Sequence, residues 1–116
     1  MISVAYRPLA VRDKRLIASY IALDLGQPQA AARTMRAIDD AIEGLKTIPA
    51  AGRLIDEPRL DGSGYRKLAV KSYWVVYRHI PESEAVVIER VLHQRMDIAP
   101  QMYYEVDYSL DDEAPL

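Results

Sequence analysis

Six basic side chains are spread over the second half of the sequence, interleaved with aromatic residues and histidines. They are Arg66, Lys67, Lys71, Arg78, Arg90 and Arg95, with Tyr73, Tyr77, His79 and His93 between them. Such a patch could cleave RNA, with a general base for the 2′-hydroxyl, an acid for the leaving oxygen and cations on the phosphate. It could also bind a protein or a protein–DNA partner without any chemistry. Composition does not separate these two functions, but both predict a basic face.

Two of these arginines, Arg78 and Arg90, fall on strand faces that are otherwise mostly apolar. An arginine is costly to bury without a partner. Each is therefore expected to reach a carboxylate such as that of Glu89 or Asp97, a backbone carbonyl, or an external anion. Internal pairing and a patch that faces a phosphate or an acidic partner both fit the pattern.

Other kinds of site lack support in the sequence. His79 and His93 are the only histidines, neither has a second histidine at ligand spacing, and the chain has no cysteine. Ser63 lies in a Gly-Ser-Gly loop without the strand–turn–helix context of a nucleophile elbow. No Gly-rich phosphate loop precedes a helix. We therefore expect no metal, no cofactor, no serine hydrolase and no nucleotide-binding protein.

The basic residues need a sheet to position them, and the sequence predicts one. Segments 65–71, 73–80 and 85–93 are rich in Val, Ile, Tyr and Trp, and residues 81–84 suit a hairpin turn. Short connections between sequential strands favour antiparallel pairing. Residues 49–64, with their prolines and glycines, are predicted to be a loop.

The first half of the chain predicts a strand and two helices. Residues 2–6 alternate as a short strand does. Pro8 and Pro28 suit first helical positions, Gly26 suits a turn between them, and apolar stripes run along 8–25 and 28–48. The predicted fold is α+β: an N-terminal strand, an antiparallel helix hairpin, then a three-stranded antiparallel meander that completes a small sheet.

Length and composition predict one domain in a reducing compartment. A chain of 116 residues can bury a single core without disulfides, and the absence of cysteine agrees with this. No apolar run approaches the roughly 18 residues of a membrane span. The N-terminal residues do not read as a secretory signal. The expected location is cytoplasmic.

The net charge of −2 hides an asymmetry along the chain. All 15 Lys and Arg residues fall within residues 1–100, together with 12 of the 17 acids, and the other five acids lie after residue 104. We therefore divide the chain into a domain over 1–100 and an acidic C-terminal arm over 101–116. The arm could screen a basic face or be a solvated end, and its apolar residues could pack on the body as a last strand or an extended arm.

The ordered set of motifs resembles the RelE/ParE toxins of bacterial type II toxin–antitoxin systems. The meander carries Gly-Tyr-Arg-Lys-Leu-Ala-Val at 64–70, Tyr-Trp-Val-Val-Tyr-Arg at 73–78 and Val-Ile-Glu-Arg-Val-Leu-His-Gln-Arg-Met-Asp at 87–97. The helical region from Asp13 to Pro49 fits the same family. The resemblance spans roughly residues 2–100 and implies a RelE/ParE-like fold for the domain.

Within this superfamily RelE-like toxins cut mRNA on the ribosome, and ParE-like toxins poison DNA gyrase. RelE-like ribonucleases carry Lys-x-Lys on the first meander strand and an arginine on the second, whereas this sequence has Arg66-Lys67-Leu68 and Trp74 there. Gln94 stands near the position of another RelE arginine. Each lost cation is typically worth a few kcal/mol of transition-state stabilisation. The segment at 91–97 is similar to the Val-Leu-His-x-x-Met segment of ParE toxins.

The leading hypothesis from the resemblance is a ParE-like gyrase inhibitor that acts by binding through the basic face, with a role in plasmid stabilisation. One alternative is a ribosome-dependent mRNA endonuclease that uses His93 with Arg66, Lys67 and Arg95. His93 could also be a structural histidine or a partner contact. Another alternative is a non-toxic antitoxin partner or corepressor.

The resemblance also implies a ParD-like antitoxin. Such a partner has a ribbon-helix-helix DNA-binding N-terminus and a disordered tail that folds along the toxin, in a toxin–antitoxin hetero-oligomer. A groove beside the helix hairpin and an open sheet edge would suit this tail. DNA contact would come from the antitoxin, so no sequence-specific DNA binding by this chain is expected, and no membrane partner either.

Overall fold

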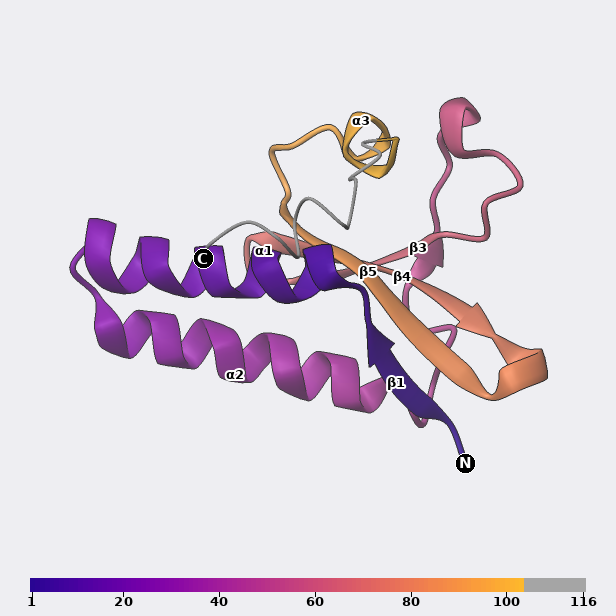
Figure 1. The fold of residues 1–116 in the computed structure, drawn as a ribbon, viewed down its shortest axis with the longest axis horizontal. Helices are drawn as coiled ribbons and strands as arrows, with labels where there is room; N and C mark the ends of the chain where they lie inside the picture. Colours follow the sequence, from indigo (N-terminus) through magenta and orange to yellow (C-terminus); the bar gives the residue numbers. More distant parts are fainter. Residues whose placement is uncertain (104–116) are drawn as a thin grey trace.

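The computed structural model describes residues 1–103, which form one sheet, a long helix hairpin and several short turns (Figure 1). In chain order the elements are β1 (Ser3–Tyr6), α1 (Pro8–Ser19), a π-helical turn (Tyr20–Asp24), α2 (Pro28–Gly44), β2 (Arg53–Leu54), a 3-10 turn (Pro58–Leu60), β3 (Arg66–Val70), β4 (Tyr73–Ile80), a second 3-10 turn (Pro81–Ser83), β5 (Ala85–His93) and α3 (Ile98–Met102). The predicted α+β fold is confirmed.

The sheet has five strands in the order β1-β5-β4-β3-β2. Strands β3, β4 and β5 form the predicted antiparallel meander. β1 pairs with β5 in parallel, from Ser3 opposite Ala85 to Tyr6 opposite Ile88, so the N-terminal strand lies at one edge. β2 pairs antiparallel with β3 and lies at the other edge.

The predicted loop over 49–64 differs from the structure, because it contains β2 and a 3-10 turn. Its start is tied to the sheet by the buried Tyr77. The Tyr77 hydroxyl accepts a hydrogen bond from the Gly52 N–H at 2.8 Å and donates one to the Pro49 carbonyl at 2.6 Å. A Cβ on Gly52 would lie 2.6 Å from a Tyr77 ring carbon, so only glycine fits this close approach. These tertiary contacts order a segment whose local sequence predicts only a loop.

The two helices form the predicted antiparallel hairpin, and each begins with its proline at the first helical position. α1 is shorter than the predicted span of 8–25, because it passes into a π-helical turn from Tyr20 to Asp24. Gly26 has a φ of +64°, the left-handed conformation that glycine adopts without strain, and this lets the chain reverse into α2. The hairpin therefore presents both apolar stripes to one face of the sheet.

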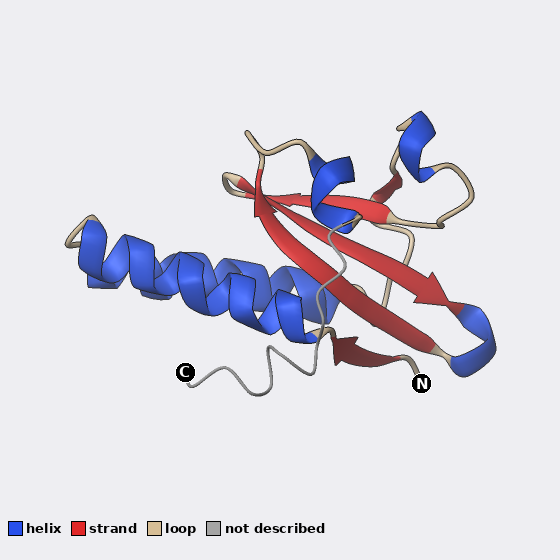
Figure 2. Cartoon of the chain, turned by 45° about the horizontal axis from the view of Figure 1, so that its top comes forward, coloured by secondary structure: helices blue, strands red, loops and turns tan. Residues whose placement is uncertain are grey.

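The sheet is covered on both faces (Figure 2). The hairpin buries one face in a large core that includes Ile38, Ile42, Tyr77 and Ile88. The other face carries a smaller core of Leu60, Val76, Leu92, Ile98 and Ala99, closed by the 3-10 turn and α3. The alternation of side chains along β4 produces this division, with Val75 and Tyr77 toward the hairpin and Val76 toward α3.

α3 runs across Pro100, so the helix spans the predicted boundary between the domain and the arm. The rest of the predicted arm, from residue 104 on, lies outside the described residues. Among residues 1–103, no helix has the length and apolar character needed to cross a membrane.

Candidate partner-binding surface

The six predicted cations do not share one face of the sheet. On β3, neighbouring side chains point to opposite faces. Arg66 donates a hydrogen bond to the Gly52 carbonyl at 2.7 Å, at the β2 edge. The Lys67 ammonium instead lies over the Trp74 ring, 4.5 Å from its centre, on the α3 side. Trp74 occupies the place where RelE-like ribonucleases carry an arginine, and here its ring is covered by a lysine.

Arg78 is paired within the molecule. Its Nε donates to Glu89 at 2.9 Å, and the carboxylate of Glu89, itself 8% exposed, also lies 3.4 Å from Arg7. The guanidinium of Arg78 lies 5.9 Å from the centre of the Tyr65 ring. The expected internal partner Glu89 is thus confirmed for Arg78, and its charge is balanced inside the protein.

Arg90 pairs with Asp13 of α1. Its Nε and Nη2 donate to the two carboxylate oxygens of Asp13 at 2.7 and 3.0 Å, and its Nη1 donates to the Gln101 carbonyl at 3.0 Å. Asp13 also accepts the backbone N–H of Val91 at 2.9 Å. β5 extends beyond its pairing with β1, so this carboxylate satisfies an edge donor where no neighbouring strand lies. Both side chains of the ion pair are only 12% exposed.

Sequence reasoning offered Glu89 and Asp97 as partners for the sheet arginines, and the Arg90–Asp13 pair was missed. Asp97 instead pairs with Arg59 at 3.0 Å. A signal was available for Asp13, since it precedes Leu16 and Ile17 by three and four residues and so lies on the apolar side of α1. A carboxylate on a buried helix face requires a cation opposite it.

The remaining cations lie near the end of β5. Lys71 sits in the β3–β4 turn with a φ of +52°, and both it and Arg95 are exposed. Gln94 holds this region together, because its side-chain amide donates to the carbonyls of Lys71 and Tyr73 at 3.1 Å each. Gln94 therefore acts on the backbone rather than pointing a polar group at a partner.

His93 lies at the wall of a groove between α1 and the ends of β4 and β5. Its Nδ1 accepts the backbone N–H of Arg95 at 3.1 Å, and its ring meets Tyr73 edge-on with centres 5.4 Å apart. An accepting Nδ1 means that the other nitrogen carries the proton in the neutral ring. The groove has a volume of about 530 Å³ and is lined by Leu16 of α1, by Tyr20 of the π-helical turn and by Arg95. Burial raises the pKa of Tyr73.

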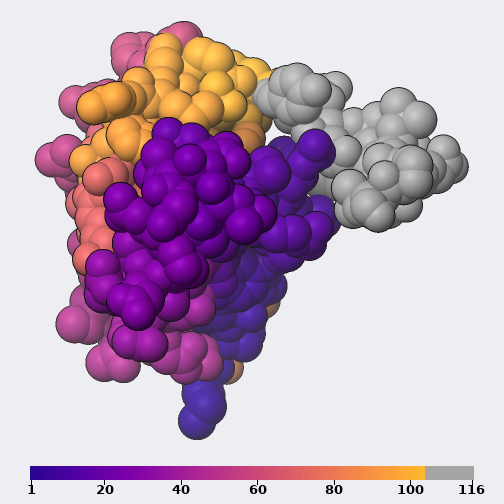
Figure 3. All heavy atoms as spheres, turned by 90° about the vertical axis from the view of Figure 1, so that its left-hand side faces the viewer, coloured from indigo at the N-terminus to yellow at the C-terminus, as the bar shows by residue number. Residues whose placement is uncertain are grey.

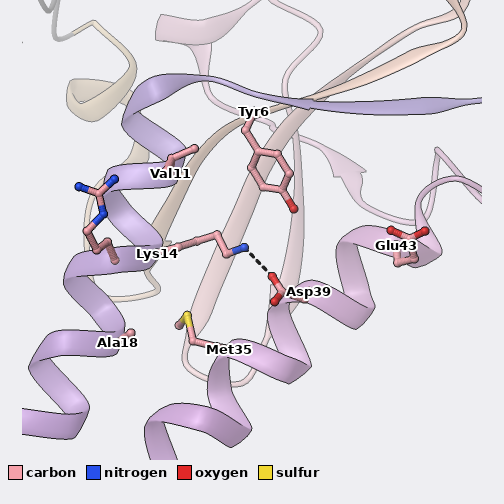
Figure 4. Close-up of a pocket in the computed structure, with 8 residues that line it drawn as sticks. Tyr6, Val11, Lys14, Ala18, Met35, Asp39 and Glu43 are labelled. Atoms are coloured by element: carbon pink, nitrogen blue, oxygen red, sulfur yellow. Dashed lines mark hydrogen bonds and ion pairs between the residues drawn. The ribbon is translucent and has the colours of Figure 1, made fainter. Parts of the chain in front are cut away.

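A second groove lies between the two helices and β1, with a volume of about 630 Å³ (Figure 4). Lys14 reaches across it to Asp39, and its ammonium lies 5.0 Å from the centre of the Tyr6 ring. Burial raises the pKa of Tyr6. Val11 and Met35 give this groove an apolar floor between the charged groups. Within residues 1–103, no group of three or more His, Cys, Asp or Glu side chains could hold a metal ion.

The fold is similar to that of solved proteins from toxin–antitoxin systems. The chromosomal ParDE toxin–antitoxin system from P. aeruginosa matches with 21% identity and a TM-score of 0.64, over 80% of this chain and 96% of that one. The RelBE2 complex from M. tuberculosis matches with 23% identity and a TM-score of 0.57, over 79% and 96%. The isolated RelE toxin of E. coli matches with 16% identity and a TM-score of 0.56 over the full length of both chains. At these identities the likeness shows the fold.

The sequence itself gives the family. No individual curated protein matches it, but the family model described as the ParE toxin of the type II toxin–antitoxin system parDE matches residues 4–98. This span includes both helices and the whole sheet except its first residue. The chain therefore belongs to the ParE toxin family of type II toxin–antitoxin systems, within the RelE/ParE superfamily.

Proposed function

We propose that this toxin inhibits DNA gyrase by binding to it, with no covalent chemistry of its own. The observation that carries the proposal is the pairing of the sheet arginines with carboxylates, Arg78 with Glu89 and Arg90 with Asp13. An arginine that donates to a carboxylate has its charge neutralised locally and offers little to a pentavalent phosphate. With Lys67 stacked on Trp74, the centre of the sheet favours docking over cleavage. The match to the ParE family model supports the same choice.

We propose that the six cations predicted to form a partner-binding basic face have different roles, according to where the fold places them. Lys71 and Arg95 are exposed near the groove at the end of β5, where they suit direct contact with a partner. Arg78 and Arg90 fix the sheet, as does Arg66 through its bond to Gly52. Lys67 shields the indole of Trp74. The contact surface is therefore the groove with its rim rather than the sheet centre.

The test is a gyrase assay with supercoiled plasmid and purified toxin. We expect loss of supercoiling and accumulation of cleaved DNA. Arg95→Glu reverses a charge on the groove rim, and it should weaken inhibition by tenfold or more if it removes roughly 1.4 kcal/mol of binding. Arg36→Glu is the matched control, since it makes the same change on the exposed side of α2. Unchanged supercoiling with toxin in clear excess would rule out gyrase as the target.

One observation favours a second candidate, ribosome-dependent cleavage of mRNA. His93 lines the groove together with the exposed Arg95, so an imidazole and a cation border one space. Cleavage of ribosome-bound mRNA that is lost in His93→Ala would support this activity against gyrase inhibition. Harmless overexpression without an antitoxin would instead favour a non-toxic partner or corepressor.

We also propose that a ParD-like antitoxin of the ribbon-helix-helix type neutralises the toxin. The solved relatives are described as the ParDE and RelBE toxin–antitoxin systems, which supports a partner of this kind. The groove between the helices, with Val11 and Met35 on its floor, offers the antitoxin an apolar binding site beside the open edge of β1 (Figure 4). Met35→Glu should abolish co-purification with the antitoxin, whereas Arg33→Glu, two residues away and exposed, should not.

A further inference from the structure

Three neighbouring hollows lie beside α1 and share lining residues, and together we call them the arginine groove. The first lies where α3 meets β4 and β5 and includes Arg7, Arg78 and Met102 in its wall. The second shares Leu9, Arg90 and Gln101 with the first. The third is the groove beside His93, and it shares Asp13, Leu16 and Arg90 with the second. Because Arg90 lies in the wall of all three, the hollows of the arginine groove follow one another from α3 to the end of β5.

This groove carries an excess of positive charge. Four arginines of its walls, Arg7, Arg78, Arg90 and Arg95, already outnumber its two carboxylates. Both carboxylates, those of Asp13 and Glu89, are already paired with arginines of the groove. The groove therefore suits an acidic occupant.

The same groove exposes apolar side chains that have no cover in the described residues. Leu16 and Tyr20 are 57% and 52% exposed, and Met96 is 41% exposed. Apolar side chains gathered with a charged rim mark a binding site more often than bare surface. The occupant should thus combine acidic and apolar residues along one short segment.

The chain supplies such a segment directly after α3. Residues 104–110 place apolar side chains at every second position, namely Tyr104, Val106, Tyr108 and Leu110. The positions between them and just after hold five acids and no basic residue, namely Glu105, Asp107, Asp111, Asp112 and Glu113. In an extended conformation this alternation gives one apolar side and one acidic side.

The described residues just before this segment line the groove, and the segment has enough residues to follow it. Gln101 and Met102, at the end of α3, line the first hollow. Figure 3 shows α3 and the residues before it (orange to yellow) directly adjoining the violet atoms of the helix hairpin. Residues 104–116 can span roughly 40 Å when extended, whereas α1, with 12 residues, is about 18 Å long.

We propose that residues 104–113 bind along the arginine groove of their own chain, with their acids against the arginines and their apolar side chains against Leu16, Tyr20 and Met96. The arm then shields this surface, and any partner that uses the groove must displace it. The proposal does not depend on whether the target is gyrase or the ribosome. It requires only the charge and the apolar surface of the groove.

A spin label on the full chain tests this contact. The chain has no cysteine, so Ser109→Cys gives one labelling site in the arm, and Ser83→Cys gives a control label at the far turn of the β4–β5 hairpin (Figure 1). With the label at 109, the amide signals of Arg12, Leu16 and Arg95 should lose most of their intensity. With the label at 83 they should keep it. Retained intensity with the label at 109 overturns the proposal.

Two further samples test whether charge holds the arm in the groove and whether the contact forms within one chain. Neutralising the five acids to Asn and Gln, in the chain labelled at 109, should restore most of the signal if charge holds the arm, and an unchanged loss would overturn that account. A mixture of labelled chains with isotope-enriched chains that carry no label reports contact between copies. Signal loss in the mixture equal to that within one chain means that the arm binds a second copy, and this outcome overturns binding within the chain.

Discussion

The two faces of the sheet are closed by very different amounts of structure. On the hairpin face ten buried side chains form one core under helices of 12 and 17 residues. On the other face five buried side chains lie under a 3-10 turn of three residues and a helix of five. The hairpin face thus supplies most of the apolar burial that drives folding. The α3 face has less of it, and the arginine groove begins at its edge.

This difference suggests a division of roles within one small domain. Changes on the hairpin face should act mainly on stability, because its side chains are fully buried. Changes at the α3 face and its rim should act more on binding, because charged side chains there remain partly exposed.

Truncating one core residue on each face should give unequal losses of stability. Ile38 is fully buried under the hairpin, and Ile38→Ala should lower the free energy of unfolding by about 4 kcal/mol. Leu60 lies in the smaller core at 5% exposure, as the last residue of a short turn that can shift to close the space, so Leu60→Ala should cost about 2 kcal/mol. Urea unfolding measures both. Equal losses would show that the two faces contribute alike.

Breaking the ion pair at the edge of β5 should cost nearly as much as a core truncation. Asp13→Asn leaves Arg90 without its counter-charge in a site that is 12% exposed, and the expected loss is about 3 kcal/mol. Glu43→Gln is the matched control, since its pair with Lys46 is exposed and should contribute no more than about 0.5 kcal/mol. A loss for Asp13→Asn as small as that of the control would mean that the Arg90–Asp13 pair contributes no more to stability than an exposed ion pair.

The position of the loop that joins the two faces should depend on the glycine at residue 52. In Gly52→Ala the new Cβ meets the Tyr77 ring and the Lys67 carbonyl at 2.6 and 2.8 Å, so the loop must shift and we expect a loss of about 2 kcal/mol. Gly44→Ala is the control, because no atom lies within 4 Å of that Cβ and alanine favours a helix by up to about 1 kcal/mol. Thermal unfolding distinguishes them by opposite shifts in Tm.

The long, periodic elements could be predicted from sequence, and the short ones could not. The apolar stripes of α1 and α2, with Pro8 and Pro28 at their starts, are local patterns that predict the helix hairpin. The alternation of side chains along the strands predicts the meander in the same way. β2, the 3-10 turn at Pro58–Leu60 and α3 were missed because each is too short to hold itself together. They exist through tertiary bonds such as those of the Tyr77 hydroxyl.

The ion pairs of the site also divide into one that the sequence could suggest and one that it could not. Glu89 was one of two carboxylates named from the sequence as possible partners of the sheet arginines, and it pairs with Arg78 across the β4–β5 hairpin. The pair of Arg90 with Asp13 joins residues 77 positions apart. Predicting it requires knowing that α1 covers the end of β5, which follows from the parallel placement of β1 and not from any local motif. The six cations therefore looked like one basic face in the sequence, although the fold distributes them over two faces and a rim.

The smallest expected effect concerns the polar link beneath α3. Arg59 donates to Glu57 and to Asp97, the residue before α3, and its hydrogen bonds lower the pKa of Glu57 from 4.5 to about 2. Because this pKa is lower in the folded state, the stabilisation is complete above about pH 4.5 and disappears as the pH falls toward 2. Removing the guanidinium should abolish the shift, so in Arg59→Gln the pKa of Glu57 should return toward 4.5. An NMR titration of the Glu57 side-chain carboxyl measures it, with Glu82, in the β4–β5 turn, as an internal reference.

Arg59→Gln also tests whether a change on the smaller face affects the hairpin face. Arg59 connects the 3-10 turn to the start of α3 through its ion pairs with Glu57 and Asp97, which lie on the smaller face. Losing it should therefore shift signals of Asp97 and α3 while those of Ile38 and Ile42 stay in place. Shifts that spread into the hairpin core would mean that the two faces are coupled through the sheet, and partner binding at the arginine groove would then be expected to change stability as well.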